Sequence, residues 1–544
     1  MFEIGKDIIK GGAVAANVRG RARLRFVQAV FFLLFAIFIT RTITLGISGP
    51  NNPARAGSAA RVQSGTWVSA RADIVDRNGD ILAKNVISGH IVLRPPRVKN
   101  ADQAAVFIHN VIPEKSISDA LADINSGKRF IYLKKLATDA QRDEVKFAKI
   151  PGVSVEETER RRYPKRRLFS HVVGFIGTDM KGLEGAERTH DRYLSENSAP
   201  LVLSVDSRIQ SVFYQELSAA MQKYQAKAAM GLLMNSRTGE MLAMVSLPDF
   251  DPENRETDSP ARRKFNPIRG VFELGSVFKV FNTAMAMETG IGLDKEYYVK
   301  DPYKITNRNG RVIATIRDVA SFKPPRPDLS VAEILAHSSN AGSVQIALDL
   351  PATAQQDFFA RANMDRALDL EFGRTERPLM PAQWGPVERA TVSIGHGIAV
   401  TPMHLLLGFN AMVGGGIYIW PTISRRGIGE IQGERVISAK ISEELRKIMF
   451  EICEDFTCRK ARIAGINIGG KTGTAEKRVE GVIDRRKNIT VFAGAFPIEA
   501  PQYTILVILD EPQGTTESFG IRTAAWNAVP VTGNILDSIL PMLF

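Results

Sequence analysis

The sequence predicts an α+β protein in which helices pack against an antiparallel sheet. Two apolar runs, 228–235 and 241–246, flank the turn Arg237-Thr238-Gly239 and are typical of a β-hairpin. Hairpins mixed with helices favour this class over a doubly wound parallel sheet. The other supporting segments are helix patterns at 207–224 and 524–540 and strand-like runs at 201–205, 489–496 and 503–509.

An apolar segment near the N-terminus predicts a membrane helix. It spans residues 26–47, and the basic residues before it are Lys6, Lys10, Arg19, Arg21, Arg23 and Arg25. The segment is long enough to cross a bilayer, and the positive-inside rule places residues 1–25 in the cytoplasm and the rest of the chain outside. A signal peptide cleaved at Ala54-Arg55-Ala56 is the alternative, and it also exports the remaining chain.

Composition restricts the ligands and partners that we expect. The net charge of +13 partly reflects the basic cluster before the apolar segment, so it does not indicate a nucleic-acid partner. The two cysteines, Cys453 and Cys458, form either one local disulfide or two separate thiols. Without nearby histidines they supply too few ligands for a metal. We therefore expect no metal and no cofactor.

The chain changes character twice between the apolar segment and residue 200. Residues 48–70 are rich in Gly, Pro, Ser, Asn and Ala and are predicted to be a tether. Residues 71–200 form a mixed module without a catalytic set, and its strand-like pieces lie at 80–82 and 91–93 and its helix pattern at 101–112. The basic run 160–167 indicates either a patch for anionic glycan or lipid headgroups or a solvated face.

The first motif that indicates chemistry is Gly275-Ser276-Val277-Phe278-Lys279, which opens a helix pattern at 280–287. Residues three apart share a helix face, so the Lys279 amine can reach the Ser276 hydroxyl. Partial burial lowers the pKa of a lysine and makes it a base that activates a serine nucleophile. On this motif alone, a helix cap is the favoured explanation of Ser276.

Two further motifs lie later in the chain. Ser338-Ser339-Asn340 comes after a helix pattern at 331–336 and is either a polar turn or a pair of groups that relay a proton (Ser338) and hold a substrate amide (Asn340). Gly470-Lys471-Thr472-Gly473-Thr474 is either an ordinary strand or turn, or an edge strand whose cation and hydroxyls bind a terminal carboxylate while Gly473 permits close approach.

The third motif also fits a phosphate-binding loop, since residues 465–472 match the pattern G-x-x-x-x-G-K-[ST]. Such a loop needs an apolar strand before Gly465 and a helix that begins at the Lys-Thr pair. Residues 459–464 are instead basic, and Gly473 would interrupt a helix that began at this pair. The predicted topology also places the segment outside the cell, where ATP is not available. The sequence therefore disfavours an ATPase.

In this order, the three motifs resemble the signature set of penicillin-binding proteins and serine β-lactamases. Two departures stand out: Leu274 replaces the usual proline before Gly275, and Ala72 replaces the usual glycine after Arg71. Further segments resemble class B penicillin-binding proteins, and most closely the division-specific FtsI type: 71–79, 162–164, 182–187, 238–244 and 395–402.

The resemblance implies a penicillin-binding transpeptidase domain at 201–544 on a pedestal (dimerisation-like) module at 71–200. Ser276 would attack the penultimate D-Ala carbonyl of a peptidoglycan stem peptide, with Lys279 as base and Ser338 as proton relay, and it would also be acylated by β-lactams. Backbone N–H groups of Ser276 and Thr474 would form the oxyanion hole. The residues implied to bind substrate are Asn340, Lys471, Thr472, Gly473 and Thr474.

The resemblance also implies a setting and partners. The protein would be a single-pass protein of the bacterial inner membrane with a periplasmic catalytic domain. It would work with a SEDS-type glycosyltransferase and other division proteins in septal wall synthesis. The alternatives are an elongation-specific class B transpeptidase, a β-lactamase or D,D-carboxypeptidase that passes the acyl group to water, and a non-catalytic sensor.

Overall fold

The computed structural model describes residues 32–33, 35, 61–63, 66–68, 71–319, 324–426, 431, 433–479 and 482–544. The chain divides into two compact units, 1–70 and 71–544. In the first unit, β1 (Arg61–Gln63) pairs antiparallel with β2 (Thr66–Val68). The predicted membrane segment lies almost entirely outside the described residues, and none of the helices within them is long and apolar enough to cross a membrane.

The second unit begins with a sheet built on one long strand. The strand-like pieces predicted at 80–82 and 91–93 belong to the single strand β4 (Ile81–Leu93), because β6 (Val153–Arg162) pairs with it across the intervening residues. The sheet is completed by β3 (Ile74–Val75), β5 (Ile131–Lys134) and β9 (Leu201–Val202). The strand predicted at 201–205 is thus only two residues long and pairs with β3 rather than with the hairpin strands.

Three helices give the early part of this unit its own apolar core, formed with β4, β5 and β6. The helix predicted at 101–112 is α2 (Ala101–Val111), and the Asn100 side chain caps it by accepting a hydrogen bond from the Gln103 N–H. The other two helices are α3 (Ile117–Ile124) and α4 (Asp139–Ala148), and short helices come after them at α5 (Ser170–Val173), α6 (Gly185–Thr189) and α7 (Asp191–Glu196).

The basic run 160–167 is only partly a solvated face. Arg161 is 5% exposed, and its Nε donates to the Glu187 carboxylate at 2.7 Å. Arg71 donates from its own Nε to the other oxygen of Glu187, also at 2.7 Å. Three neighbours pair with carboxylates that come after the hairpin: Arg162 and Arg166 with Glu253, and Arg167 with Asp249 and Asp258. Internal ion pairs therefore account for these cations, and the prediction of a solvated face was wrong for Arg161.

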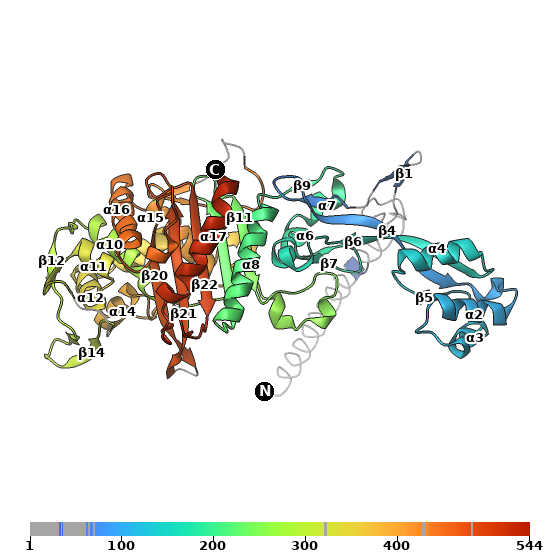
Figure 1. Ribbon diagram of the computed structural model, residues 1–544, viewed down its shortest axis with the longest axis horizontal. Helices are drawn as coiled ribbons and strands as arrows, with labels where there is room; N and C mark the ends of the chain where they lie inside the picture. Colours follow the sequence, from blue (N-terminus) through green and yellow to red (C-terminus); the bar gives the residue numbers. More distant parts are fainter. Residues whose placement is uncertain are drawn as a thin grey trace, which may run out of the picture. The chain divides into compact units, whose positions relative to one another are not determined.

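A five-stranded antiparallel sheet forms the centre of the remaining chain, in the order β11-β10-β22-β21-β20 (Figure 1). The predicted hairpin is confirmed as β10 (Ala228–Asn235) and β11 (Met241–Leu247). The other strands are β20 (Gly469–Val479), β21 (Val482–Phe496) and β22 (Tyr503–Asp510). The third motif therefore lies on β20, at the edge of the sheet.

Helices cover both faces of this sheet (Figure 1). On one face lie α8 (Ser207–Lys223), capped by Asp206, and α17 (Ala528–Leu543). The opposite side carries α10 (Phe278–Glu288), α11 (Val331–His337), α12 (Asn340–Asp349), α14 (Pro386–Ser393), α15 (Pro402–Val413) and α16 (Ala439–Asp455). This is the α+β class that the sequence predicts.

Smaller elements join these layers. Four two-stranded sheets pair β7 (Phe175–Ile176) with β8 (Gly182–Glu184), β12 (Glu296–Tyr298) with β15 (Asp328–Ser330), β13 (Tyr303–Thr306) with β14 (Val312–Ile316), and β16 (Asp369–Leu370) with β17 (Gly373–Arg374). A fifth pairs β18 (Ile417–Ile419) with β19 (Gly433–Arg435), and short helices are α9 (Asn266–Arg269) and α13 (Ala354–Arg361).

Candidate active site

Ser276 lies in a single turn of 3-10 helix, Gly275–Val277, that leads directly into α10. The residue at the N-cap position of α10 is Val277, and no side chain caps either the turn or the helix. The interpretation of Ser276 as a helix cap is therefore wrong. Its side chain is partly exposed at the start of a helix whose later turns are buried.

Two glycines let this turn approach the edge strand closely. Gly275 has φ +62°, and a Cβ there would lie 2.6 Å from the Thr474 carbonyl oxygen. A Cβ on Gly473 would lie 2.2 Å from the carbonyl oxygen of Leu274, the residue that replaces the usual proline. Any side chain at either position would push the turn away from β20. The first and third motifs are therefore held in backbone contact, with Ser276 beside Thr474.

Lys279 is in the first turn of α10 and is 1% exposed. Its Nζ donates to the carbonyl oxygen of Ser338 at 2.5 Å, to the Ser338 hydroxyl at 3.2 Å and to Asn340 Oδ1 at 2.7 Å. In this structure the amine thus binds the second motif rather than Ser276. Burial lowers the pKa of Lys279 well below its ordinary value, and the neighbouring charge of Lys471 lowers it further.

The second motif is a turn, and it is also the link between the two lysines. Ser338 has φ +61° at the junction of α11 and α12, and the Ser339 hydroxyl caps α12 by accepting from the Gly342 N–H at 3.0 Å. The left-handed conformation of Ser338 turns its carbonyl and hydroxyl toward Lys279. Lys471 Nζ donates to the same hydroxyl at 3.0 Å. One serine oxygen therefore lies between two amines.

The third motif occupies an edge strand, as its carboxylate-binding interpretation requires. Lys471 is completely buried, and burial lowers its pKa to about 7. The Thr472 hydroxyl lies 2.9 Å from that of Thr457, and the Thr474 hydroxyl accepts from the Ala524 N–H at 3.1 Å. Because Lys471 lies within a strand and no helix begins there, the phosphate-loop interpretation is excluded.

Asp318 belongs to this site, although no sequence motif pointed to it. Its carboxylate accepts hydrogen bonds from the Asn340 N–H, from the Ser339 hydroxyl at 3.0 Å and from the Ala341 N–H at 3.4 Å. It therefore holds the start of α12, where helix N–H groups lack partners within the helix. Its charge also opposes the lowering of the Lys279 pKa. Burial raises the pKa of Asp318 itself.

Residues 229–531 match the family model described as the penicillin binding protein transpeptidase domain. The chain belongs to this family. Residues 66–199 match a second model, the penicillin-binding protein dimerisation domain. The resemblance carried by the three motifs is thereby confirmed.

Curated relatives resemble this penicillin-binding transpeptidase over nearly its whole length. It is 31% identical to the probable peptidoglycan D,D-transpeptidase FtsI of Caulobacter vibrioides, over 97% of this chain and 90% of that protein. It is 28% identical to the peptidoglycan D,D-transpeptidase FtsI of Escherichia coli K12, over 95% and 91% of the two chains. A solved peptidoglycan synthetase from Bifidobacterium adolescentis shares the fold, with a TM-score of 0.67 at 20% identity over 87% and 95%.

Proposed function

We propose that this penicillin-binding transpeptidase cross-links peptidoglycan stem peptides through an acyl-enzyme on Ser276. Relatives named peptidoglycan D,D-transpeptidase support the reaction. The observation that carries the residue assignment is the Ser338 hydroxyl, which lies 3.2 Å from Lys279 Nζ and 3.0 Å from Lys471 Nζ. A hydroxyl between two buried amines of lowered pKa provides a short path for protons beside the turn that holds Ser276.

In the proposed reaction, the Ser276 oxygen attacks the carbonyl carbon of the penultimate D-Ala, and neutral Lys279 takes the hydroxyl proton. The C–N bond to the terminal D-Ala then breaks, and the leaving amine receives a proton through Ser338. The amine of a second stem peptide attacks the ester, transfers its proton back to the same groups and releases Ser276. A β-lactam acylates Ser276 through the same first step.

The remaining site residues are proposed to bind the donor. Backbone N–H groups of Ser276 and Thr474 would stabilise the oxyanion, which the contact between the 3-10 turn and β20 supports. Asn340, held by Lys279 and Asp318, would orient the amide of the acyl chain. The residues proposed to hold the donor carboxylate, or that of a β-lactam, are Lys471, Thr472, Gly473 and Thr474.

We also propose the cellular setting. Residues 26–47 would form one transmembrane helix, with 1–25 in the cytoplasm, 48–70 as tether, a pedestal at 71–200 and a periplasmic transpeptidase domain at 201–544. The FtsI names of the relatives support a septal role. The proposed partner, a SEDS-type glycosyltransferase, rests on the family resemblance alone. Depletion should give filamentous cells, whereas spherical cells would favour the elongation-specific alternative.

Labelling with a fluorescent penicillin tests the reaction and its nucleophile. We expect one label per chain, recovered on the peptide that contains Ser276, because the acceptor in the proposed reaction is an amine rather than water and the penicillin-derived acyl-enzyme therefore persists. The Ser276→Ala variant should remain folded and unlabelled. Equal labelling of this variant would overturn the assignment, and steady hydrolysis of penicillin by the natural protein would favour a β-lactamase.

The acylation rate should fall as the pH falls through the pKa of Lys279, which burial and the charge of Lys471 hold well below its ordinary value. Above this pKa the Lys279 amine is neutral and can accept the Ser276 proton. Below it the amine is protonated and the base is lost. The second-order rate constant for penicillin labelling, measured from pH 5 to 9, would check this, and a flat profile would contradict it.

The Lys471→Met variant gives a sharper form of the same test. The charge of Lys471 lowers the pKa of Lys279, so its removal should raise that pKa. The acid limb of the residual labelling rate should therefore move to higher pH. An unchanged or lower inflection would show that Lys279 does not govern the profile.

A further inference from the structure

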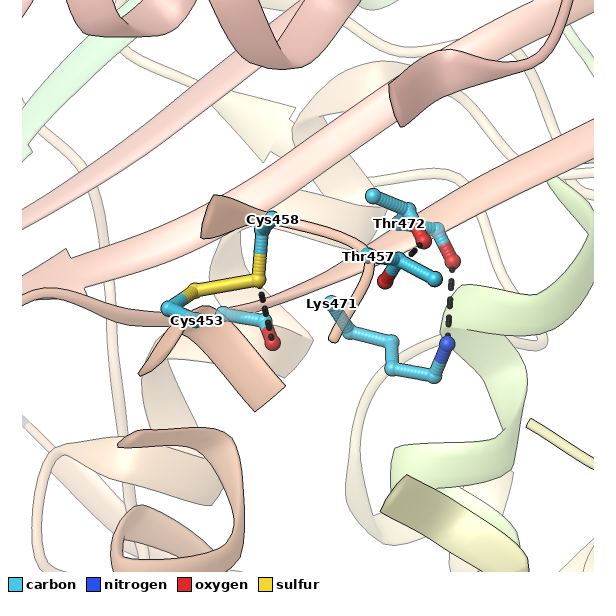
Figure 2. Close-up of a disulfide and its surroundings, with 6 residues drawn as sticks. Cys453, Thr457, Cys458, Lys471 and Thr472 are labelled. Carbon is cyan, nitrogen blue, oxygen red and sulfur yellow. Dashed lines mark hydrogen bonds between the residues drawn. A yellow bond between two sulfur atoms is a disulfide. The ribbon is translucent and has the colours of Figure 1, made fainter. Parts of the chain in front are cut away.

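A disulfide closes a six-residue loop beside the edge strand (Figure 2). Cys453 lies near the end of α16, and Cys458 lies just before the 3-10 turn Arg459–Ala461. Their Cα atoms are 4.4 Å apart, and both residues are completely buried. The spacing of the cysteines left open whether they are joined, and the structure shows the bond. We call residues 453–458 the disulfide loop.

Three consecutive residues of the disulfide loop contact the third motif and the residue just before the second motif. The ring of Phe456 packs edge-on against His337, which precedes Ser338, with 4.8 Å between ring centroids. The Thr457 hydroxyl lies 2.9 Å from the Thr472 hydroxyl, and Cys458 Sγ lies 3.7 Å from the Gly470 carbonyl oxygen (Figure 2). An oxidised cysteine carries no thiol hydrogen, so this last approach is a packing contact.

The hydroxyl pair has a chemical consequence for carboxylate binding. A threonine hydroxyl donates one hydrogen and accepts through two lone pairs. If Thr472 donated to Thr457, its hydrogen would be unavailable to a ligand carboxylate. If Thr457 donates to Thr472, the Thr472 hydrogen remains available. A carboxylate that accepts from Thr472 therefore selects the second arrangement.

We propose, on the basis of the transpeptidase function proposed above, that Thr457 is a positioning residue that orients the Thr472 hydroxyl toward the donor carboxylate, and that the Cys453–Cys458 disulfide holds it there. Thr472 is 8% exposed on the edge strand, whereas Thr457 is exposed on its loop. A threonine on an open loop loses conformational freedom when its hydroxyl is fixed. The covalent bond between the ends of the loop removes part of that freedom in advance.

The experiment separates binding from chemistry in the acylation of the full-length protein by penicillin. We expect Thr457→Val, which keeps the shape and removes the hydroxyl, to raise the dissociation constant of the non-covalent complex about 3- to 10-fold. The limiting acylation rate should stay unchanged, because Ser276, Lys279 and Ser338 are untouched. Thr457→Ser should restore binding. Thr306→Val, at an exposed threonine of β13, is the matched control and should change neither constant.

A penicillin with a blocked carboxylate tests whether Thr457 acts on carboxylate binding. With a penicillin whose carboxylate is blocked as its methyl ester, Thr457→Val and the natural protein should bind equally. An equal loss with acid and ester would overturn the assignment to the carboxylate. A dissociation constant unchanged by Thr457→Val, or a loss confined to the limiting rate, would overturn the positioning role.

The double variant Cys453→Ala/Cys458→Ala tests the part played by the disulfide. It should raise the dissociation constant for the acid in the same direction as Thr457→Val, with the limiting rate retained. Normal binding in this variant would overturn the role of the disulfide and leave that of Thr457 standing. If the variant does not fold, the Thr457 and ester measurements decide the positioning role. Failure of the natural protein to label at Ser276 is a separate outcome that would refute the underlying function.

Discussion

Replacing Lys279 with methionine should lower the limiting rate of Ser276 acylation about 10²- to 10⁴-fold, the usual contribution of a positioned general base. Methionine retains an unbranched side chain of similar length in a site where lysine is 1% exposed. It cannot accept the Ser276 proton. It also leaves the Ser338 carbonyl and Asn340 Oδ1 without the donor that binds them at 2.5 and 2.7 Å.

Pre-steady-state labelling with a fluorescent penicillin would measure this effect. The dissociation constant of the non-covalent complex should change much less than the limiting rate, because the proposed carboxylate-binding residues remain. Lys295→Met is the matched control, since Lys295 is 45% exposed and pairs with Asp349. A limiting rate for Lys279→Met within tenfold of the natural value would show that another group takes the serine proton.

Replacing Glu187 with glutamine should reduce the free energy of unfolding by about 3–5 kcal/mol, the cost of removing one partner from a buried ion pair. Glu187 is 0% exposed and accepts from Arg71 Nε and Arg161 Nε at 2.7 Å each. Glutamine preserves the shape but leaves two buried cations without this counter-charge. Asp191 remains near Arg71, and Asn85 remains near Arg161, so part of the network survives.

Thermal and denaturant unfolding of the purified protein would detect the loss. The matched control is Glu196→Gln, because Glu196 and Arg192 form an exposed pair with side chains 59% and 87% accessible. That change should alter stability by at most about 1 kcal/mol. Similar small effects of both substitutions would contradict a structural role for the Glu187 network. The penicillin-labelling stoichiometry of the folded Glu187→Gln protein should stay unchanged.

Local sequence patterns were sufficient to predict those helices and strands whose residues form one continuous pattern in the sequence. The hairpin at 228–247 and the helices α2, α8, α10 and α11 are predicted by apolar periodicity and turn residues within a few positions of each other. Periodicity failed at β4, because residues 84–90, which lie between its two predicted pieces, are paired by β6, more than 60 positions away in the chain. It also failed to show that Arg161 is buried, since Glu187 lies 26 positions further on.

In the candidate site, too, some residues were predicted from local sequence and others were not. The order of three short motifs was enough to identify the family, because the triple is far more specific than any one member. Asp318 and Thr457 had no such signal. Each belongs to the site because it contacts a motif residue: Asp318 contacts Asn340, and Thr457 contacts Thr472. Neither contact can be predicted from the spacing of residues in the sequence. The disulfide was undecided for the same reason, because it depends on the 4.4 Å Cα separation that the fold creates.

The sequence by itself determined the α+β class, the family and the chemically competent residue types, because these depend on local periodicity and on motifs within a few positions. Only the tertiary structure decided how the motifs meet. It placed the Ser338 hydroxyl between two lysines 192 positions apart in sequence, Lys279 and Lys471, and buried both. Burial lowers the pKa of each amine. That burial is produced by helices and strands outside the motifs, so it cannot be predicted from the motifs alone.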